Sequence, residues 1–286
     1  MLLLITIAIA TFLISIVYCE KARLSHVIMP FHPRQLENVK ENLKLWSRYA
    51  PCDKDSKLQG IGFIFYVSSN KSNIANVEKF ESELFKSAEI NMRCFKFFSI
   101  EYAGLSGDDD GYLLGSRLMF EKMIKKKINF GPSKPSHVFY MEPDCKPIRS
   151  RWLGALNNLI VEPNAPFWMK GSLFRGSDGI INHNNLYNRI HINGNAIYNL
   201  SDESFSNFFI NVVRQVIKAK FHDNGAYDTD IYRVLLWRNG QYTAPFFHMF
   251  QWSDFIQNHW HSEYSLKEIL ENSPNTFFIH GGKSLD

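Results

Sequence analysis

An apolar segment that ends in two carboxylates is the part of this sequence best suited to chemistry. Residues 137–141 have the pattern of a buried strand, and Glu142 and Asp144 follow with only Pro143 between them. Open α/β sheets bind ligands at the carboxyl ends of their strands. Two hard oxygen ligands in this spacing suit Mg²⁺ or Mn²⁺ on a diphosphate, so a nucleotide-sugar enzyme is the first hypothesis. The alternative is a strand that ends in two solvated acids.

A second candidate segment lies near residue 280. His280, Gly281, Gly282 and Lys283 come directly after an apolar run at 277–279. A histidine at a strand end can complete a metal site, and glycines let a backbone approach phosphates closely. Lys283 would then pair with a diphosphate oxygen. The alternative is a C-terminal tail without a ligand.

With these motifs the chain resembles a GT-A-fold glycosyltransferase of the nucleotide-diphospho-sugar transferase superfamily, over residues 24–286. Residues 26–49 are similar to the strand and helix that open such domains. Glu142 and Asp144 resemble the acidic D-x-D or E-x-D signature that holds the metal, and Asp144 matches the usual direct ligand. His280 resembles the late histidine that supplies a third metal ligand in many members.

The resemblance implies a metal-dependent enzyme that moves a sugar from a nucleotide-diphosphate donor to a hydroxyl of a glycan or glycoprotein. Glu142, Asp144 and His280 would hold Mn²⁺ or Mg²⁺. Such an ion neutralises the leaving diphosphate as a Lewis acid and positions the donor for the reaction.

Three acids near residue 228 are candidates for the carboxylate base that an inverting transferase places at the acceptor hydroxyl. Asp228 is the first choice, Asp230 is the second, and Asp223 is a third. They lie just before or within a predicted helix at 228–237. Helix capping and a favourable interaction with the helix dipole are therefore the alternative role.

A polar set at residues 191–195 is predicted to bind a sugar. His191, Asn193 and Asn195 surround Gly194, so that donors and acceptors for sugar hydroxyls would lie around a tight turn. A structured turn without a ligand is the alternative.

Two further residues are predicted to contact the nucleotide. Tyr66, at the end of a predicted strand, would flank the base. Arg117, one turn into a helix that follows the acidic loop at 108–110, would reach a phosphate. The alternative for the loop is a solvated helix cap.

These candidates need a scaffold, and the order of predicted elements indicates an α/β fold with a mostly parallel central sheet flanked by helices. The strands are predicted at 24–31, 60–67, 94–100, 137–141, 167–174, 193–200 and 276–280. The helices are predicted at 33–49, 73–86, 112–126, 152–160, 205–218 and 228–237. Neither a GxGxxG motif nor a P-loop is present. We predict one continuous GT-A-like domain over residues 24–286.

The composition of the chain excludes several other classes. Its 286 residues are 45% hydrophobic, which supports a sizeable core and argues against disorder. The formal net charge is +4, without a long basic run among aromatic residues, so no nucleic acid is expected as a partner. No C-x-x-C pair occurs, so a zinc–thiolate site has no support.

The N-terminal segment predicts a secretory address. Residues 2–18 are almost wholly apolar, so residues 1–23 would form a cleaved signal peptide or an uncleaved signal anchor. The chain would then be a secreted or single-pass type II membrane protein with its domain in the ER or Golgi lumen. Sequons at 70–72 and 199–201 agree with this address. If Cys19 leaves with a signal, three cysteines remain, enough for one disulfide and one free thiol.

Two alternative functions remain open from the sequence. One is a metal-dependent phosphoester hydrolase, which needs more converging ligands, often for two metals. The chain has one H-x-H sequence, at 259–261, without a D-x-H beside it. The other is a non-catalytic, lectin-like sugar-binding protein on the same fold, which would not need the metal set.

Overall fold

A seven-stranded sheet forms the centre of the computed structural model, which describes residues 22–53, 60–161, 165–175, 190–221, 225–260 and 262–286. The sheet order is β3-β2-β1-β4-β7-β6-β8. Its strands are β1 Leu24–Phe31, β2 Gly62–Ser69, β3 Phe97–Leu105, β4 His137–Tyr140, β6 Met169–Gly171, β7 Ala196–Asn199 and β8 Phe250–Trp252. Strands β1 to β4 are parallel, whereas β7 runs antiparallel to β4 and β6. The predicted mostly parallel α/β sheet is therefore confirmed.

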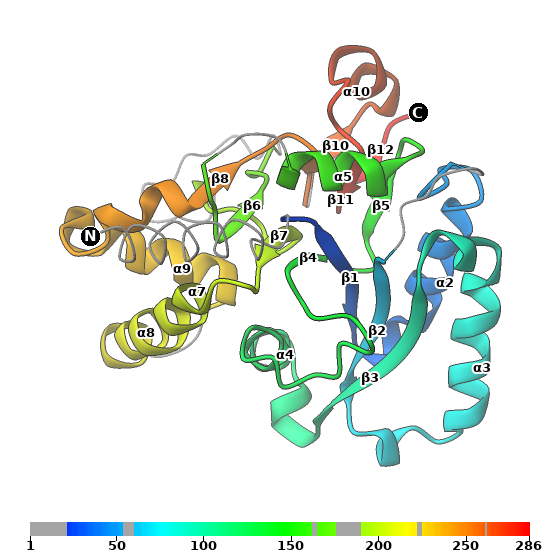
Figure 1. The fold of residues 1–286 in the computed structure, drawn as a ribbon, viewed down its shortest axis with the longest axis horizontal. Coiled ribbons are helices and arrows are strands. Elements are labelled where there is room, and N and C mark those ends of the chain that lie inside the picture. The colour runs from blue at the N-terminus through cyan, green and yellow to red at the C-terminus, as the bar shows by residue number, and fades with distance from the viewer. Residues whose placement is uncertain (1–21, 54–59, 162–164, 176–189, 222–224, 261) are drawn as a thin grey trace, which may run out of the picture.

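Helices cover both faces of this sheet (Figure 1). One face carries α2 Leu36–Leu45, α3 Val77–Ala88 and α5 Trp152–Val161. The other carries α4 Leu114–Ile124, α7 Glu203–Phe208, α8 Arg214–Lys220 and α9 Tyr227–Leu236. The shorter helical segments are η1 Pro33–Gln35, η2 Lys71–Asn73, η3 Glu89–Cys94, η4 Gly107–Asp110, η6 Phe209–Val213, η7 Trp237–Gly240, η8 Ala244–Met249 and α10 Leu266–Asn272.

The two cores follow from the alternation of side chains along the strands. In β1, Val27 and Met29 pack with α2, α3 and α5, whereas Ile28 packs with α4 and α7 to α9. In β4, Phe139 and Tyr140 likewise enter opposite cores. Side chains of a strand point alternately to the two faces, and parallel sheets are buried on both. This pattern explains why the central strands are almost continuously apolar.

Two small sheets complete the fold. Strand β11, Phe278–His280, pairs antiparallel with β5, Cys145–Pro147, and parallel with β9, Ile256–Asn258. Strands β10, Glu263–Tyr264, and β12, Lys283–Ser284, pair with each other. The register places His280 opposite both Cys145 and Asn258. This pairing holds His280 next to the segment that follows β4.

One disulfide and one free cysteine occur among the described residues. Cys52 and Cys94 are bonded, and they join the connection after α2 to the end of η3. Cys145 is a buried free thiol. This is the arrangement of one disulfide and one free thiol that the sequence allowed.

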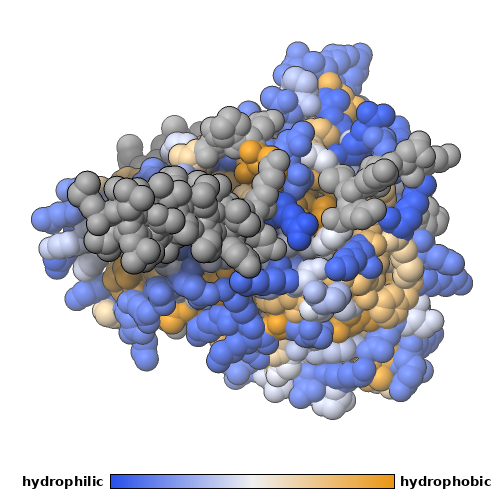
Figure 2. Space-filling view, in the orientation of Figure 1, coloured by the Kyte–Doolittle hydropathy of each residue, from blue (hydrophilic) through white to orange (hydrophobic). Residues whose placement is uncertain are grey.

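Figure 2 shows hydrophilic residues over the projecting α10, and hydrophobic residues gathered over the region of β2 and β3. Strand β3 is the edge strand there, and most of its residues are only half-buried. The predicted leader at 1–23 lies almost entirely outside the described residues. Within the described part of the chain, no helix is both long and apolar enough to cross a membrane.

Candidate active site

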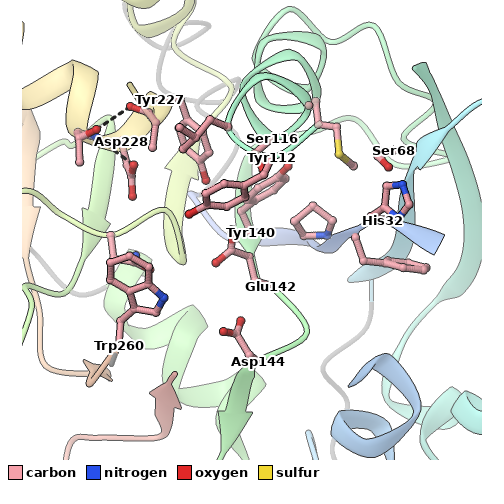
Figure 3. Close-up of a pocket in the computed structure, with 18 of the residues that line it drawn as sticks. His32, Ser68, Tyr112, Ser116, Tyr140, Glu142, Asp144, Tyr227, Asp228 and Trp260 are labelled. Carbon is pink, nitrogen blue, oxygen red and sulfur yellow. Dashed lines mark hydrogen bonds between the residues drawn. The ribbon is translucent and has the colours of Figure 1, made fainter. Parts of the chain in front are cut away.

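A cavity of about 740 Å³ opens at the carboxyl ends of β1, β2 and β4 (Figure 3). Strand β1 lies between β2 and β4, so the sheet order reverses direction at β1. Crevices at such switch points are the usual ligand sites of open α/β sheets, and this volume lies in the range of small-molecule pockets. The polar lining includes the predicted residues Glu142, Asp144, His191, Asn193, Asp228 and His280.

Glu142, Asp144 and His280 converge at this cavity. One ligand atom from each lies within 4.8 Å of the other two. The Nε2 atom of His280 is 3.3 Å from Oε2 of Glu142 and 3.3 Å from Oδ2 of Asp144. The carboxylate side chains are 34% and 47% exposed, whereas the imidazole is only 6% exposed. Two accessible carboxylates and one buried imidazole are a donor set that fits Mn²⁺ or Mg²⁺.

The local backbone explains why Glu142 and Asp144 lie close together. The Cys145 N–H donates to the Glu142 carbonyl, which closes a turn around Pro143. The buried Asn42 amide donates to the carbonyls of Pro143 and Cys145 at 2.8 Å each. Asn42 of helix α2 therefore holds the backbone of the turn, and the side chains of both acids line the cavity.

Asn258 orients His280. Its Oδ1 atom lies 3.2 Å from His280 Nδ1 and also accepts from the Trp260 N–H, so we assign the Nδ1 proton to His280. This leaves Nε2 facing the two acids. Burial opposes a charge on His280, but its hydrogen bonds to Asp144 and Glu142 outweigh burial and raise its pKa to about 10. A metal ion bound at Nε2 would displace the second ring proton, which Nε2 carries when the imidazole is charged.

Asn195 supports Glu142 and does not face the cavity. It is fully buried, and its Oδ1 accepts from the Glu142 N–H at 2.7 Å. Its Nδ2 donates to Glu142 Oε2 and to Asn193 Oδ1. The prediction that Asn195 binds the sugar directly is corrected here, because its amide is already occupied by these partners.

Asp228 forms a second acidic centre at the same cavity. Its Oδ2 accepts from the Gly194 N–H at 2.8 Å and lies 3.4 Å from His191 Nε2. Its Oδ1 accepts from the Thr229 N–H. Burial raises the pKa of this carboxyl, but His191 and the two N–H donors outweigh burial and lower the pKa below its usual value. Gly194 thus contributes a backbone donor. A side chain at this position would collide with the Tyr227 hydroxyl, since a Cβ would lie 2.2 Å from its oxygen.

Asp230 does not reach the cavity, which corrects its predicted role as a base. Its side chain is fully buried, with Oδ2 3.2 Å from Arg214 Nη1 and Oδ1 3.4 Å from Arg233 Nη1. The helical turn of α9 that points Asp228 toward the cavity points Asp230 into the contact with α8. Asp223 lies outside the described residues.

The three predicted nucleotide contacts are also placed elsewhere. Tyr66 is fully buried and donates to the Met119 carbonyl, because strand alternation directs it into the core. Arg117 is buried near Glu121, while Gly115, Ser116 and Met119 of α4 line the cavity. Lys283 lies on the exposed strand β12 and is not part of the cavity lining.

The structure adds His32 to the cavity, together with Asp110 and Tyr112 from the acidic loop and the residues that follow it. His32 and Asp110 face each other at 3.5 Å, and Asp110 also accepts from Ser69. Tyr112 also lines the cavity and is 82% exposed. His32 follows the first predicted strand directly, and the acidic loop precedes the helix from which Arg117 was predicted to reach a phosphate.

Comparisons with known proteins give the fold. No family model and no curated protein sequence matches the chain. The galactosyltransferase LgtC, solved with donor and acceptor sugar analogues, is 11% identical over 90% of this chain and 86% of its own, with a TM-score of 0.52. Mouse xyloside xylosyltransferase 1 is 11% identical over 90% and 96%, with a TM-score of 0.50. The bifunctional glycosyltransferase WbbM is 13% identical over 93% of this chain and 47% of its own, with a TM-score of 0.50. The chain therefore has the GT-A fold.

Proposed function

We propose that this chain is a metal-dependent glycosyltransferase, which moves a sugar from a nucleoside-diphosphate donor to a hydroxyl of a glycan or glycoprotein. One observation carries the proposal. Glu142, Asp144 and His280 meet within 4.8 Å at the cavity of a GT-A fold, although two of them are separated from the third by most of the second half of the chain. LgtC, which shares this fold, was solved with donor and acceptor sugar analogues.

In this proposal Glu142, Asp144 and His280 hold Mn²⁺ or Mg²⁺. The ion would act as a Lewis acid and neutralise the charge that develops on the leaving diphosphate. Asn195 fixes Glu142 and Asn258 fixes the His280 ring, so the ligands need little rearrangement to bind.

The donor nucleoside would lie beside His32, Ser68 and Asp110, which line the end of the cavity near β1 and β2. The Ser68 hydroxyl and Asp110 Oδ1 are buried and have no hydrogen-bond partner among the described residues. Buried polar atoms of this kind normally have partners, so a ligand hydroxyl or base edge would satisfy them. Pro30 and Phe31 would supply the apolar wall there.

The transfer would occur near Asp228, His191 and Asn193, which line another part of the cavity. The bond from the anomeric carbon to the diphosphate oxygen breaks, a bond from the acceptor oxygen to that carbon forms, and the hydroxyl proton passes to the departing diphosphate. The lowered pKa of Asp228 makes it a weak proton acceptor. In place of the role of base predicted from the sequence, we therefore assign Asp228 the orientation of hydroxyl groups and the stabilisation of positive charge at the anomeric carbon.

We also propose that residues 24–286 act as one lumenal domain behind a signal peptide or signal anchor at 1–23, in the ER or Golgi. The Cys52–Cys94 disulfide supports an oxidising compartment. Asn70 of the first sequon is exposed, as a glycan acceptor must be.

Hydrolysis of nucleotide sugars tests the proposal directly. A panel of uridine- and guanosine-diphosphate sugars is incubated with the full domain and Mn²⁺, with or without a chelator. We expect turnover with Mn²⁺ only, and a loss of about a hundredfold in Asp144→Asn, because metal sites of this kind supply several kcal/mol. Asp109→Asn is the matched control, since Asp109 is exposed and does not line the cavity.

Two results would contradict the assignment. Turnover that is insensitive to chelation and to Asp144→Asn would remove the metal role. Hydrolysis of simple phosphoesters, with no activity on nucleotide sugars, would favour the phosphoester hydrolase. Such enzymes often use two metals, whereas one candidate metal-binding cluster was found among the described residues.

A further inference from the structure

A half-exposed tryptophan stands in the wall of the cavity. Trp260 is 49% exposed and lines the cavity together with Phe174, Asn193 and Asn258. Tyr242 and Trp252 are more exposed than Trp260, so exposure alone does not mark a site, but Trp260 differs from both because it lines the cavity. A ring that is open within a ligand cavity is positioned to be covered by the ligand.

The backbone holds Trp260 in place. Its N–H donates to Asn258 Oδ1, and the preceding His259 N–H donates to the His280 carbonyl. Gly281 has φ +60°, and a Cβ there would lie 3.0 Å from the Trp260 Cα. The left-handed glycine therefore allows the Trp260 segment to pack directly on the turn after His280. As a result, the backbone of Trp260 has a fixed place relative to the candidate metal ligands.

The order of residues along the cavity assigns Trp260 to the acceptor end. Figure 3 places His32 and Ser68 on one side of Glu142 and Asp144, and Trp260 with Asp228 on the other. A donor with its nucleoside beside His32 and its diphosphate at the two acids would place its sugar toward Asp228. Trp260 then lies beyond the transferred sugar, where the acceptor must enter.

We propose that Trp260 is the stacking wall for a pyranose ring of the acceptor, so that the acceptor is a glycan and not a serine or threonine hydroxyl of a protein. This inference rests on the proposed glycosyltransferase function. A pyranose presents a face of C–H groups that packs on an aromatic ring, while its hydroxyls remain free for hydrogen bonds. Asn193, His191 and Asp228 line the cavity at this end to receive them. A serine or threonine side chain offers no such face.

The test compares transfer with donor hydrolysis in the same enzyme. The acceptor probes are p-nitrophenyl pyranosides of glucose, galactose, mannose and xylose, and a peptide rich in serine and threonine. We expect transfer to at least one pyranoside and none to the peptide. Trp260→Ala should raise the pyranoside KM about tenfold and lower the ratio of transfer to hydrolysis by a similar factor, the loss expected for one ring contact. Trp260→Phe should recover part of this loss.

Trp252→Ala is the matched control, because Trp252 is 61% exposed but does not line the cavity. It should leave the acceptor KM unchanged. An unchanged acceptor KM in Trp260→Ala would overturn the inference, and so would transfer to the peptide alone. If the wild-type protein hydrolyses no nucleotide sugar with Mn²⁺, the proposed function fails first, which is a different result from active hydrolysis with no role for Trp260.

Discussion

Two clusters of acid and histidine share one cavity but differ in how they are closed. Glu142, Asp144 and His280 form the open cluster, whose carboxylate side chains are 34% and 47% exposed. Asp228 and His191 form the closed cluster, and both of their side chains are only 10% exposed. The same residue types therefore occur in two distinct environments at the same end of the sheet.

The hydrogen bonds of the carboxylates explain this difference. Both oxygens of Asp228 accept backbone N–H groups, from Thr229 and Gly194, and His191 adds a third partner. Glu142 and Asp144 instead face one shared imidazole, Glu142 also accepts from the Asn195 amide, and both acids keep accessible surface. The internal partners of Asp228 make it contribute to the stability of the fold while it lines the cavity, whereas two accessible carboxylates beside an imidazole can accept a cation.

The largest expected effect separates the clusters by stability. Asp228→Asn should lower the free energy of unfolding by about 2–3 kcal/mol, because an amide group would oppose a backbone N–H donor and hydrogen bonds to a charged group are lost. Asp144→Asn should lower it by less, about 1 kcal/mol, because Asp144 is 47% exposed and Glu142 still faces the His280 imidazole. Chemical denaturation of both variants measures these values.

The loss of catalytic activity should rank the two variants in the opposite order to the loss of stability. In the same two variants, nucleotide-sugar hydrolysis per folded molecule should fall more in Asp144→Asn than in Asp228→Asn. Equal losses of stability in the two variants would show that the two clusters do not differ in the way their hydrogen bonds indicate.

Lowering the pH to 5 should reduce the free energy of unfolding through His137 and not through Asp228 of the closed cluster. Burial, and the charge of Lys170, lower the pKa of His137 from 6.5 to about 4. Between these values the unfolded chain binds a proton that the folded protein excludes, so stability falls as the pH falls. By pH 5 this loss is about 2 kcal/mol. The lowered pKa of Asp228 acts only below pH 3.8, where its contribution is lost as the pH falls through the folded value.

The measurement is the free energy of unfolding at pH 7 and pH 5. His137→Gln should reduce the difference between the two pH values, and Asp228→Asn should leave that difference unchanged. Burial also lowers the pKa of His26, so the His137 variant should still lose some stability at acid pH, but less than the wild type. A pH dependence that disappears in Asp228→Asn would instead place the acid-sensitive group in the closed cluster.

The central sheet could be predicted from the sequence because its signal is local. The first strand was predicted at 24–31 and is observed at Leu24–Phe31, and its apolar run reflects burial on both faces. The helix predicted at 205–218 is instead α7 and α8 joined by a π-helical segment, Phe209–Val213. Apolar periodicity gives the presence of a helix here but not the change in its hydrogen bonding.

The candidate site could be predicted only in part, because convergence depends on pairing far along the chain. Glu142 and Asp144 follow a strand, and this local signal was sufficient. The meeting of His280 with them depends on the β5–β11 pair, which was expected only through the family resemblance. The direction of Asp230 and Asn195 depends on their tertiary partners, Arg214 and Glu142, which no local pattern contains.

The smallest effect tests the link between the two clusters. Asn195 bonds to both the N–H and the carboxylate of Glu142, and the adjacent Gly194 N–H bonds to Asp228. Asn195→Ala should weaken Mn²⁺ binding about tenfold, the usual cost of losing a residue that orients a metal ligand. Titration calorimetry with Mn²⁺ measures this directly. Because Asn195 would act through Glu142, its substitution should have no further effect on Mn²⁺ affinity in a Glu142→Ala background. Additive losses in the double variant would mean that Asn195 supports the site by another route, through the loop that carries Gly194.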